Sequence, residues 1–296
     1  MSLKNPKVSI TLIGSGNLAQ ALGPALRKAG YVIDAVIARS NMESRKRAGR
    51  LARKVGARVQ AIEEFEPKSH LIWLLHTDDA LGETAKALAK SGKWKGKSVF
   101  HSSGALTSDV LEPLKRAGAY SASLHPMMTF VPGSTPEMSG IPFAVEGDKA
   151  AVAVAKQIAR DVGGEVFEIR KENKVLYHAL GSFSSPMLVA TLVTAERVGR
   201  GAGLNPVQTR KVMRPILEQT LRNYFAGGAA AAFSGPIKRG DLETIRRHLR
   251  ELARIPEAGD VYRALVKSGL MELPSARKRK VLKMLTTKGT KERSSL

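Results

Sequence analysis

The stretch that decides the fold is Lys7-Val-Ser-Ile-Thr-Leu-Ile13, which continues as Gly14-Ser-Gly-Asn-Leu-Ala19. The first part is a short apolar run rich in β-branched residues, and apolar residues then recur at helical spacing up to Leu26. This order predicts a strand, a tight turn and a helix. Gly14 would allow the sharp turn, and Gly16 would let a ligand approach the backbone closely.

Asn17 and Leu18 follow the glycine turn, where it leads into the predicted helix. A helix N-terminus offers unpaired N–H groups and the positive end of a dipole to an anion. A strand, a glycine turn and a helix in this order are typical of sites that bind the pyrophosphate of a dinucleotide. We therefore predict a dinucleotide site at Gly14, Gly16, Asn17 and Leu18. The alternative is a purely structural turn.

The composition is that of a globular protein. The chain has 296 residues, more than one compact core usually holds, and 43% of them are hydrophobic, so two domains are expected. It has no cysteine, which excludes disulfides, thiolate catalysis and cysteine metal sites, and we predict no metal site. Residues 1–6 lack the apolar core of a signal peptide, and no apolar run approaches a membrane span. We expect a cytoplasmic protein.

The chain is strongly basic, with a formal net charge of +22. Such a charge suits nucleic acid, an anionic surface or acidic small molecules. The charge is spread widely, with dense patches at 45–58 and 277–283, and residues 288–296 have the composition of a frayed tail. Aromatic residues make up only 5% and do not interleave with the basic patches, which argues against nucleic-acid binding.

A second apolar strand is predicted over 31–38, and it ends at Arg39-Ser40. In a dinucleotide fold, the end of this strand meets the adenosine ribose, where an acidic residue favours a free 2′-hydroxyl and an arginine accommodates a 2′-phosphate. Arg39 and Ser40 therefore favour NADP over NAD, with Arg45 as a possible second contact. Alternatively, Ser40 or Asn41 only caps the next helix.

Polar residues also follow three further predicted strands. His76 ends the strand over 70–76 and Thr77 follows it, His101 and Ser102 follow 97–100, and His125 follows 119–124. Open α/β sheets bind ligands at the carboxyl ends of their strands, so these residues are predicted to face one crevice. Each histidine is alternatively a hydrogen-bonded structural residue, and Asp78 is predicted to cap the helix over 80–90.

The strand pattern stops near Arg170. Helical patterns follow over 171–201, 206–225, 242–252 and 260–267. We therefore predict an α/β protein with a Rossmann dinucleotide-binding domain over 1–170. A mostly α-helical domain for substrate binding and dimerisation, with a basic C-terminal tail, is predicted over 171–296.

Lys174 and His178 lie one turn apart on the first helix of the second domain, and so share a face. If that face overhangs the strand ends, a partly desolvated lysine could protonate a substrate during hydride transfer, with the histidine assisting. The alternative is a surface lysine beside Glu172 and a packed histidine. Arg239, in a glycine-rich turn, suits a carboxylate, and Asn223 suits a polar group, although both are otherwise ordinary loop residues.

Four motifs in one order resemble a known family. They are His125-Pro-Met-Met-Thr-Phe130, Phe143-Ala-Val-Glu-Gly-Asp148, Lys174 with Tyr177-His178, and Ser234-Gly-Pro-Ile-Lys-Arg-Gly-Asp241. Together they resemble the Rossmann-like predicted NADP oxidoreductases whose C-terminal part is domain of unknown function 2520. That family is similar to ketopantoate reductase, pyrroline-5-carboxylate reductase and the 6-phosphogluconate and β-hydroxyacid dehydrogenases. The resemblance covers Lys7 to about Leu265.

The resemblance implies a helical C-terminal domain that often forms a dimer interface, so a homodimer is expected. It also implies that a lysine on the first inter-domain helix, with an asparagine one turn later, binds and protonates the substrate. Lys174 falls where that lysine should be, and His178 takes the place of the asparagine. The family continues this helix with Ser-Asn, whereas this chain has Ser185-Pro186, so one substrate contact is in question and a kink at Pro186 is expected.

The expected function is NADP-dependent reduction of a small carboxylate-bearing carbonyl or imine, with 2-dehydropantoate as the leading candidate substrate. Lys174 is the expected general acid, assisted by His178, while His125, Asn223 and Arg239 shape the substrate pocket. A non-catalytic NADP(H) sensor with the same fold is the first alternative. A nucleic-acid binder that uses the basic surface is the second.

Overall fold

A computed structural model describes residues 7–134 and 136–286. Contacts within the chain divide it into two compact units, Met1–Ser184 and Ser185–Leu296, which are described separately below. The helix that follows Arg170 groups with the first unit, whereas the predicted boundary placed it in the second. The tail over 288–296, which the composition suggested was frayed, lies outside the described residues.

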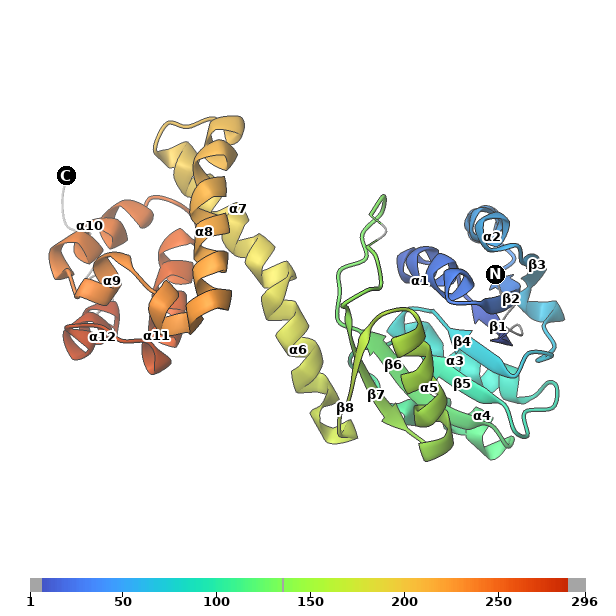
Figure 1. The fold of residues 1–296 in the computed structure, drawn as a ribbon. Coiled ribbons are helices and arrows are strands. Elements are labelled where there is room, and N and C mark those ends of the chain that lie inside the picture. The colour runs from blue at the N-terminus through green and yellow to red at the C-terminus, as the bar shows by residue number, and fades with distance from the viewer. Residues whose placement is uncertain (1–6, 135, 287–296) are drawn as a thin grey trace, which may run out of the picture. The chain divides into compact units, whose positions relative to one another are not determined.

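The first unit is built on a twisted sheet with the strand order β3-β2-β1-β4-β5-β6-β7-β8 (Figure 1). Neighbouring strands run parallel except β6 and β7, which are antiparallel. The strands are β1 (Lys7–Ile13), β2 (Tyr31–Ala38), β3 (Arg58–Ala61), β4 (Leu71–Leu74), β5 (Ser98–His101), β6 (Tyr120–Pro126), β7 (Pro142–Gly147) and β8 (Glu165–Glu168). From β1 the chain adds β2 and then β3 on one side, and it then crosses to add β4 on the other side of β1. The strand order therefore reverses between β1 and β4. In such sheets the reversal point is where ligands bind.

Helices cover both faces of this sheet. They are α1 (Asn17–Lys28), α2 (Met42–Val55), α3 (Asp78–Ala89), α4 (Glu112–Arg116) and α5 (Lys149–Asp161), with short 3₁₀ turns at Ile62–Glu64, Ser108–Leu111 and Lys171–Asn173. The helix α6 (Lys174–Ser184) follows the last strand. Alternate residues of β4 point to opposite faces: Leu71 and Trp73 pack with α1, α2 and α5, whereas Ile72 and Leu74 pack with α3 and α4. Because both faces are buried, the strand is apolar throughout, as the sequence suggested.

The first residues of α2 and α3 can be compared with the predicted N-caps. Asn41 caps α2, since its Oδ1 accepts a hydrogen bond from the Ser44 N–H at 2.8 Å. The prediction for Asp78 is wrong by one position: Thr77 is the N-cap of α3, and Asp78 is its first residue. There the Asp78 carboxylate still lies at the positive end of the helix dipole, which is why an acidic residue suits the position.

The second unit is helical, as the sequence predicted. Its helices are α7 (Pro186–Gly201), α8 (Pro206–Ala232), α9 (Gly235–Arg239), α10 (Leu242–Leu252), α11 (Ala258–Glu272) and α12 (Lys278–Thr286). Asp241 caps α10 through its bond from the Thr244 N–H at 3.1 Å, as predicted. The basic patch over 277–283 opens α12, which the sequence analysis did not predict. Val281 and Leu285 of α12 are buried in the core of this unit, while most of the charges face outward.

The helical pattern over 171–201 is interrupted at Ser185 and Pro186, as expected. Ser185 leaves the helical region with φ −130° and ψ −83°, and Pro186 starts α7, where its missing N–H costs no helical bond. An 18-residue window within this stretch has a mean hydropathy of 1.2, and 6% of the window is buried. The expectation that no apolar run approaches a membrane span is therefore wrong for this stretch. One such helix, judged by length and composition alone, is weak evidence for a span.

Candidate functional site

The glycine turn after β1 has the geometry of a phosphate-binding turn. Gly14 has a φ of +113°, and a Cβ on it would lie 2.7 Å from the Leu75 carbonyl oxygen, so only glycine fits there. Gly16 is different, because a Cβ on it would meet no atom within 4 Å. Protein atoms therefore pack directly against Gly14, whereas the space beside Gly16 is open, which leaves room for a ligand at the Gly16 backbone.

The N-terminus of α1 lies at this open position. Gly16 is its N-cap, and no described side chain caps it, so the first N–H groups of the helix keep their capacity to bind an anion. The Asn17 side chain is engaged in hydrogen bonds within the protein. Its Nδ2 donates to the Phe130 carbonyl at 3.0 Å, and its Oδ1 accepts from Arg47 at 3.2 Å. Leu18 packs against the apolar core, so only its backbone can serve a ligand.

A hollow of about 410 Å³ adjoins the turn. It is lined by the turn, the end of β2, the start of α2 and the segment around the end of β4 and start of α3: Gly14, Ser15, Gly16, Ile37, Ala38, Arg39, Asn41, Glu43, Ser44, Arg47, Ile62, Leu75, His76, Thr77, Ala80 and Thr84. Five of the predicted cofactor residues meet here, namely Gly14, Gly16, Arg39, His76 and Thr77. The size is within the usual range for small-molecule sites.

Arg39 and Arg47 give this hollow its positive charge. Arg39 is exposed at the end of β2, and Arg47 reaches in from α2. The sequence analysis did not predict that Arg47 and Ser44 line this site. A signal was available, because the cap at Asn41 marks the start of a helix. Residues three apart on a helix share a face, so Ser44 and Arg47 point the same way. Interaction with the Ser40 hydroxyl lowers the pKa of the Glu63 carboxyl, and Ser40 does not line the hollow.

His76 lies at the floor of the hollow. Its Nδ1 is 3.1 Å from the Thr84 hydroxyl, and its ring edge is close to Gly14. Burial, with a smaller effect from the Arg39 charge, lowers the pKa of His76, so the imidazole is neutral near pH 7. A neutral ring at this place can contact a cofactor without adding charge.

His101 does not face the crevice, so that prediction is wrong. Its ring has no exposed surface, its Nδ1 accepts from the Ser103 N–H at 3.1 Å, and its Nε2 lies 3.2 Å from the Thr107 carbonyl oxygen. Ser102 is similarly engaged, because its hydroxyl donates to the Leu124 carbonyl at 2.9 Å and accepts from the Trp73 indole at 2.8 Å. The side chains of His101 and Ser102 therefore form hydrogen bonds that hold the loop after β5 in place, and these polar atoms are not available to a cofactor.

The buried His101 ring makes stability depend on pH. Burial lowers the pKa of His101 to about 3, against about 6.5 in an unfolded chain. Between these two pH values, His101 is protonated in the unfolded state and neutral in the folded state. The free energy of unfolding therefore falls as pH drops from 6.5 toward 3, by about 1.4 kcal/mol per pH unit for this group. His125, with a pKa lowered to about 4, steepens the same slope.

The measurement is urea unfolding at pH 7 and at pH 5.5. A matched variant is His101→Asn, because an asparagine Oδ1 can replace the ring Nδ1 as the acceptor for the Ser103 N–H. We expect this variant to show a smaller loss of stability between the two pH values. An equal loss in both proteins would contradict the assignment.

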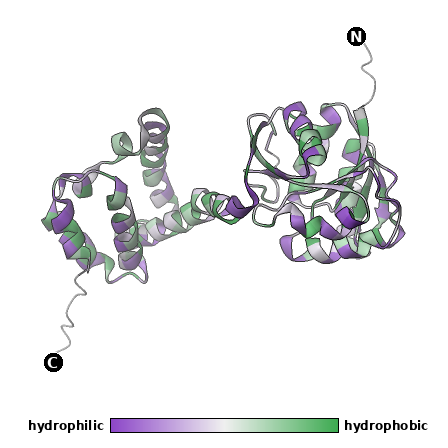
Figure 2. Cartoon of the chain, turned by 90° about the horizontal axis from the view of Figure 1, so that it is seen from below, coloured by the Kyte–Doolittle hydropathy of each residue, from purple (hydrophilic) through white to green (hydrophobic). Residues whose placement is uncertain are grey.

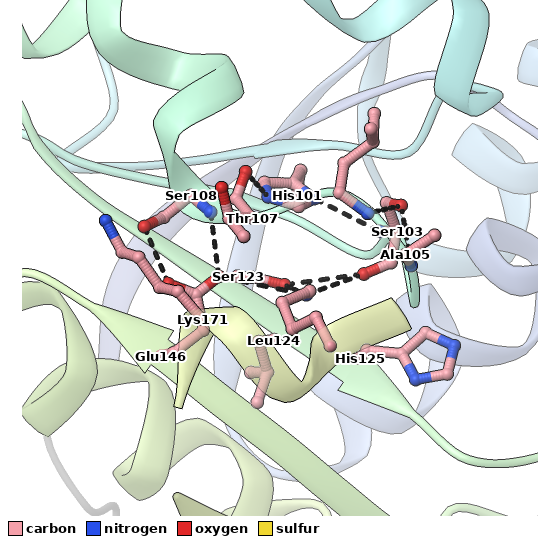
Figure 3. A network of polar contacts seen from close by, with 12 residues as sticks. His101, Ser103, Ala105, Thr107, Ser108, Ser123, Leu124, His125, Glu146 and Lys171 are labelled. Atoms are coloured by element: carbon pink, nitrogen blue, oxygen red, sulfur yellow. Dashed lines mark hydrogen bonds and ion pairs between the residues drawn. The ribbon is translucent and has the colours of Figure 1, made fainter. Parts of the chain in front are cut away.

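A buried polar network lies beside this loop (Figure 3). The Lys174 ammonium donates to the Ser103 carbonyl at 3.0 Å and to the Ser123 hydroxyl at 2.5 Å, and it lies 3.8 Å from the Glu146 carboxylate. Glu146 also accepts from the Ser108 N–H at 2.7 Å and from the Ser108 hydroxyl at 2.8 Å. Only 1% of Lys174 is exposed, and burial lowers its pKa to about 8 against the opposing attraction of Glu146.

The face of α6 that carries Lys174 and His178 does overhang the strand ends. Lys174 contacts the loop at Ser103, and a Cβ on Gly104 would lie 2.5 Å from the His178 ring. His125 is there too, with its Nε2 2.9 Å from the same Cβ position and its ring centroid 6.2 Å from that of His178. His178 is exposed, whereas Lys174 is enclosed.

Two predicted substrate residues lie in the second unit. Asn223 is exposed on α8 and accepts a hydrogen bond from Gln219 at 2.6 Å, and Arg239 is exposed at the end of α9. Their part in a substrate pocket stays a prediction. Among the residues that the structure describes, no three histidine, aspartate or glutamate side chains gather as metal ligands would.

Two domain families match the sequence. A Rossmann-like domain matches residues 1–126, and a domain of unknown function, DUF2520, matches residues 141–268. The chain combines a Rossmann-like domain with a DUF2520 domain. This pairing confirms the resemblance that the four motifs suggested, and the Rossmann-plus-helical fold with it. No curated protein matches the sequence.

The chain is also similar to solved structures of oxidoreductases. A candidate NADP oxidoreductase from Bacteroides fragilis is 27% identical with a TM-score of 0.74, and the match covers 88% of this chain and 97% of that one. A pyrroline-5-carboxylate reductase from Coxiella burnetii is 17% identical with a TM-score of 0.57, covering 95% and 99%. A reductive aminase from Aspergillus terreus, in complex with NADPH and ethyl levulinate, is 18% identical with a TM-score of 0.59, covering 90% and 94%. The fold is that of NADP oxidoreductases.

Proposed function

We propose that this protein is an NADP-dependent oxidoreductase that reduces a small carboxylate-bearing carbonyl or imine, with 2-dehydropantoate as the leading candidate. The observation that carries the proposal is the hollow beside the glycine turn. It combines an uncapped helix N-terminus, an open backbone position at Gly16 and two arginines, Arg39 and Arg47. These groups fit the phosphates of NADPH, which supplies the hydride when bound.

In this proposal Lys174 and His178 supply the proton that the reduced heteroatom needs. Burial brings the pKa of Lys174 to about 8, so the amine can lose a proton near neutral pH. Its ammonium is enclosed by Ser103 and Ser123, so direct protonation of a substrate requires the Lys174 side chain to leave these partners. His178 is exposed beside Gly104 and is the member of the pair that is open to a substrate.

The experiment is a titration with NADPH and NADH, followed by a screen of 2-keto acids and cyclic imines in which NADPH oxidation is measured. We expect tighter binding of NADPH, and oxidation with one of the two substrate classes. His178→Gln is expected to lower turnover more than it weakens NADPH binding. Tight NADPH binding without oxidation across the screen would favour the non-catalytic sensor instead.

The charge of Arg39 is expected to set the preference for NADPH. Arg39→Ala should raise the Kd for NADPH by about tenfold or more, because a hydrogen bond to a charged group contributes about 1.5–3 kcal/mol. The Kd for NADH should not change. Calorimetric titration measures both constants. Arg50→Ala is the matched control, since Arg50 is exposed on α2, carries the same charge and does not line the hollow. An equal effect on both nucleotides would contradict the prediction.

We also propose that the protein acts as a homodimer in the cytoplasm. Figure 2, coloured by hydropathy, shows hydrophobic residues mixed with hydrophilic ones along the helices of the chain. Large apolar side chains lie exposed on three helices: Val175, Leu176, Leu180 and Phe183 of α6, Met187, Leu188, Val189 and Val193 of α7, and Val207, Val212, Ile216, Leu221, Tyr224 and Phe225 of α8. Apolar surface of this extent on a single chain is typical of an interface. A second copy is the proposed occupant, because the resemblance implies dimers.

Ile216→Glu is expected to convert the dimer to a monomer, because it buries an unpaired carboxylate in the interface. Sedimentation velocity measures the change. The control is Gln219→Glu, which adds the same charge at an exposed polar position of the same helix. An unaltered protein that sediments as a monomer would contradict the dimer, and its recovery from cells only in the membrane fraction would contradict the cytoplasmic location.

A further inference from the structure

Tyr177 and His125 form a pair that the sequence analysis did not assign. The Tyr177 hydroxyl lies 3.0 Å from Nδ1 of His125, and the two rings meet edge to face with centroids 5.5 Å apart. Tyr177 also packs against Phe167, at a centroid distance of 5.9 Å. Burial raises the pKa of Tyr177 to about 12, so its hydroxyl keeps its proton at any physiological pH. The phenol is therefore a permanent hydrogen-bond donor beside this imidazole.

The other nitrogen of His125 has no such partner. Among residues 7–134 and 136–286, no hydrogen bond involves its Nε2, and the atom is not sealed from solvent. Nε2 lies against Gly104, whose missing side chain leaves the position that a Cβ would occupy, 2.9 Å from this nitrogen. In Figure 3 the His125 ring points away from the buried network around Ser123. This edge of the ring is thus free to meet a ligand at the strand ends.

The charge state of His125 follows from its neighbours. Burial, assisted by the positive charges of Lys174 and His178, lowers the pKa of His125 to about 4. The ring is therefore neutral near pH 7 and carries one N–H. A phenol donates a hydrogen bond more readily than it accepts one, so the Tyr177 hydroxyl selects Nδ1 as the acceptor. The proton of the ring then lies on Nε2.

We propose that Tyr177 is a positioning residue that fixes His125 as the Nε2–H tautomer, and that this N–H hydrogen-bonds the heteroatom of the substrate C=O or C=N group. This inference rests on the proposed oxidoreductase function and names the group that polarises the substrate. When hydride adds to the substrate carbon, a C–H bond forms and the π electron pair moves to the heteroatom. The Nε2–H stabilises that charge, and the heteroatom takes its proton from the Lys174–His178 pair.

The first arm of the test needs no substrate. Long-range proton–nitrogen NMR spectra of the histidine rings, with the full chain, distinguish the two neutral tautomers, and His125→Gln identifies the His125 signals. We expect a protonated Nε2 and an unprotonated Nδ1. Tyr177→Phe keeps the ring contact with Phe167 and removes only the hydroxyl, and should give a mixture of tautomers. The control is Tyr120→Phe, at an exposed tyrosine on β6. An Nδ1–H tautomer in the unaltered protein, or the same tautomer in Tyr177→Phe, would overturn the inference.

The second arm uses the substrate found by the NADPH oxidation screen. Tyr177→Phe should lower kcat by about tenfold or more, because the His125 N–H is no longer held where charge develops on the substrate heteroatom. The KM for NADPH should stay unchanged. An unchanged kcat would overturn the role in the reaction. A screen that yields no substrate would count against the oxidoreductase proposal alone, because the NMR arm still decides how Tyr177 and His125 are paired.

Discussion

Lys174→Met is expected to lower the free energy of unfolding by about 3–5 kcal/mol, because removing one partner of a buried ion pair leaves the other charge without compensation. The charge left behind is Glu146, of which 6% is exposed and which lies 3.8 Å from the ammonium. Methionine matches the length of the lysine stem, so loss of packing contributes little. Thermal unfolding should show a midpoint lower by roughly 10 °C.

A second substitution separates the charge effect from other causes. In Lys174→Met with Glu146→Gln, the buried charge is gone, and the glutamine amide can still bond the Ser108 N–H and hydroxyl. We expect this double variant to recover most of the lost stability. If it is no more stable than Lys174→Met alone, the ion pair is not the reason for the loss. The same pair of variants reports on function, since neither keeps an ammonium beside Ser103.

Gly16→Ala is expected to weaken NADPH binding by about tenfold or more while leaving the fold intact. The backbone at Gly16 has a φ of −65°, which alanine adopts freely, and the new methyl group would meet no protein atom within 4 Å. The methyl instead occupies the space left for the phosphates, and losing one charge-assisted hydrogen bond of about 1.5–3 kcal/mol changes Kd by that factor. Calorimetric titration and thermal unfolding on the same sample measure both effects.

Gly14→Ala is the matched comparison, two residues away. Here the φ of +113° and the approach of 2.7 Å to the Leu75 carbonyl predict strain of about 1–3 kcal/mol, so stability should fall together with binding. A Gly16→Ala protein that binds NADPH normally would remove the glycine turn from the proposed site. A Gly14→Ala protein as stable as the original would contradict the turn geometry.

The fold was largely predictable because its signals are local. A β-branched run, two glycines and apolar residues at helical spacing lie within residues 7–26, and they predicted the strand, turn and helix that the structure shows from β1 to α1. The break at Pro186 was predictable for the same reason, since a proline blocks the helix that precedes it. α12 was missed because its apolar residues, Val281 and Leu285, are hidden among lysines in a segment whose charge dominates the pattern.

The candidate site was predictable only in part, because much of it depends on contacts between distant segments. Lys174 meets Ser103 and Ser123 across 71 and 51 residues of sequence. No spacing rule could show that this lysine is enclosed, that His101 turns inward, or that the Tyr177 hydroxyl reaches His125. The cofactor turn could be predicted because its residues are consecutive. The groups around Gly104 could not, because tertiary packing alone brings them together.

The bond from the Trp73 indole to Ser102 has a practical consequence. The chain has two tryptophans, and only Trp73 lies at the carboxyl end of β4, next to the strand ends of the candidate site. Trp94 is buried elsewhere, with its indole on the Leu88 and Ser91 carbonyls. In a Trp94→Phe protein, the remaining indole becomes a built-in fluorescent probe, so that occupancy of the crevice can be followed in real time without a label.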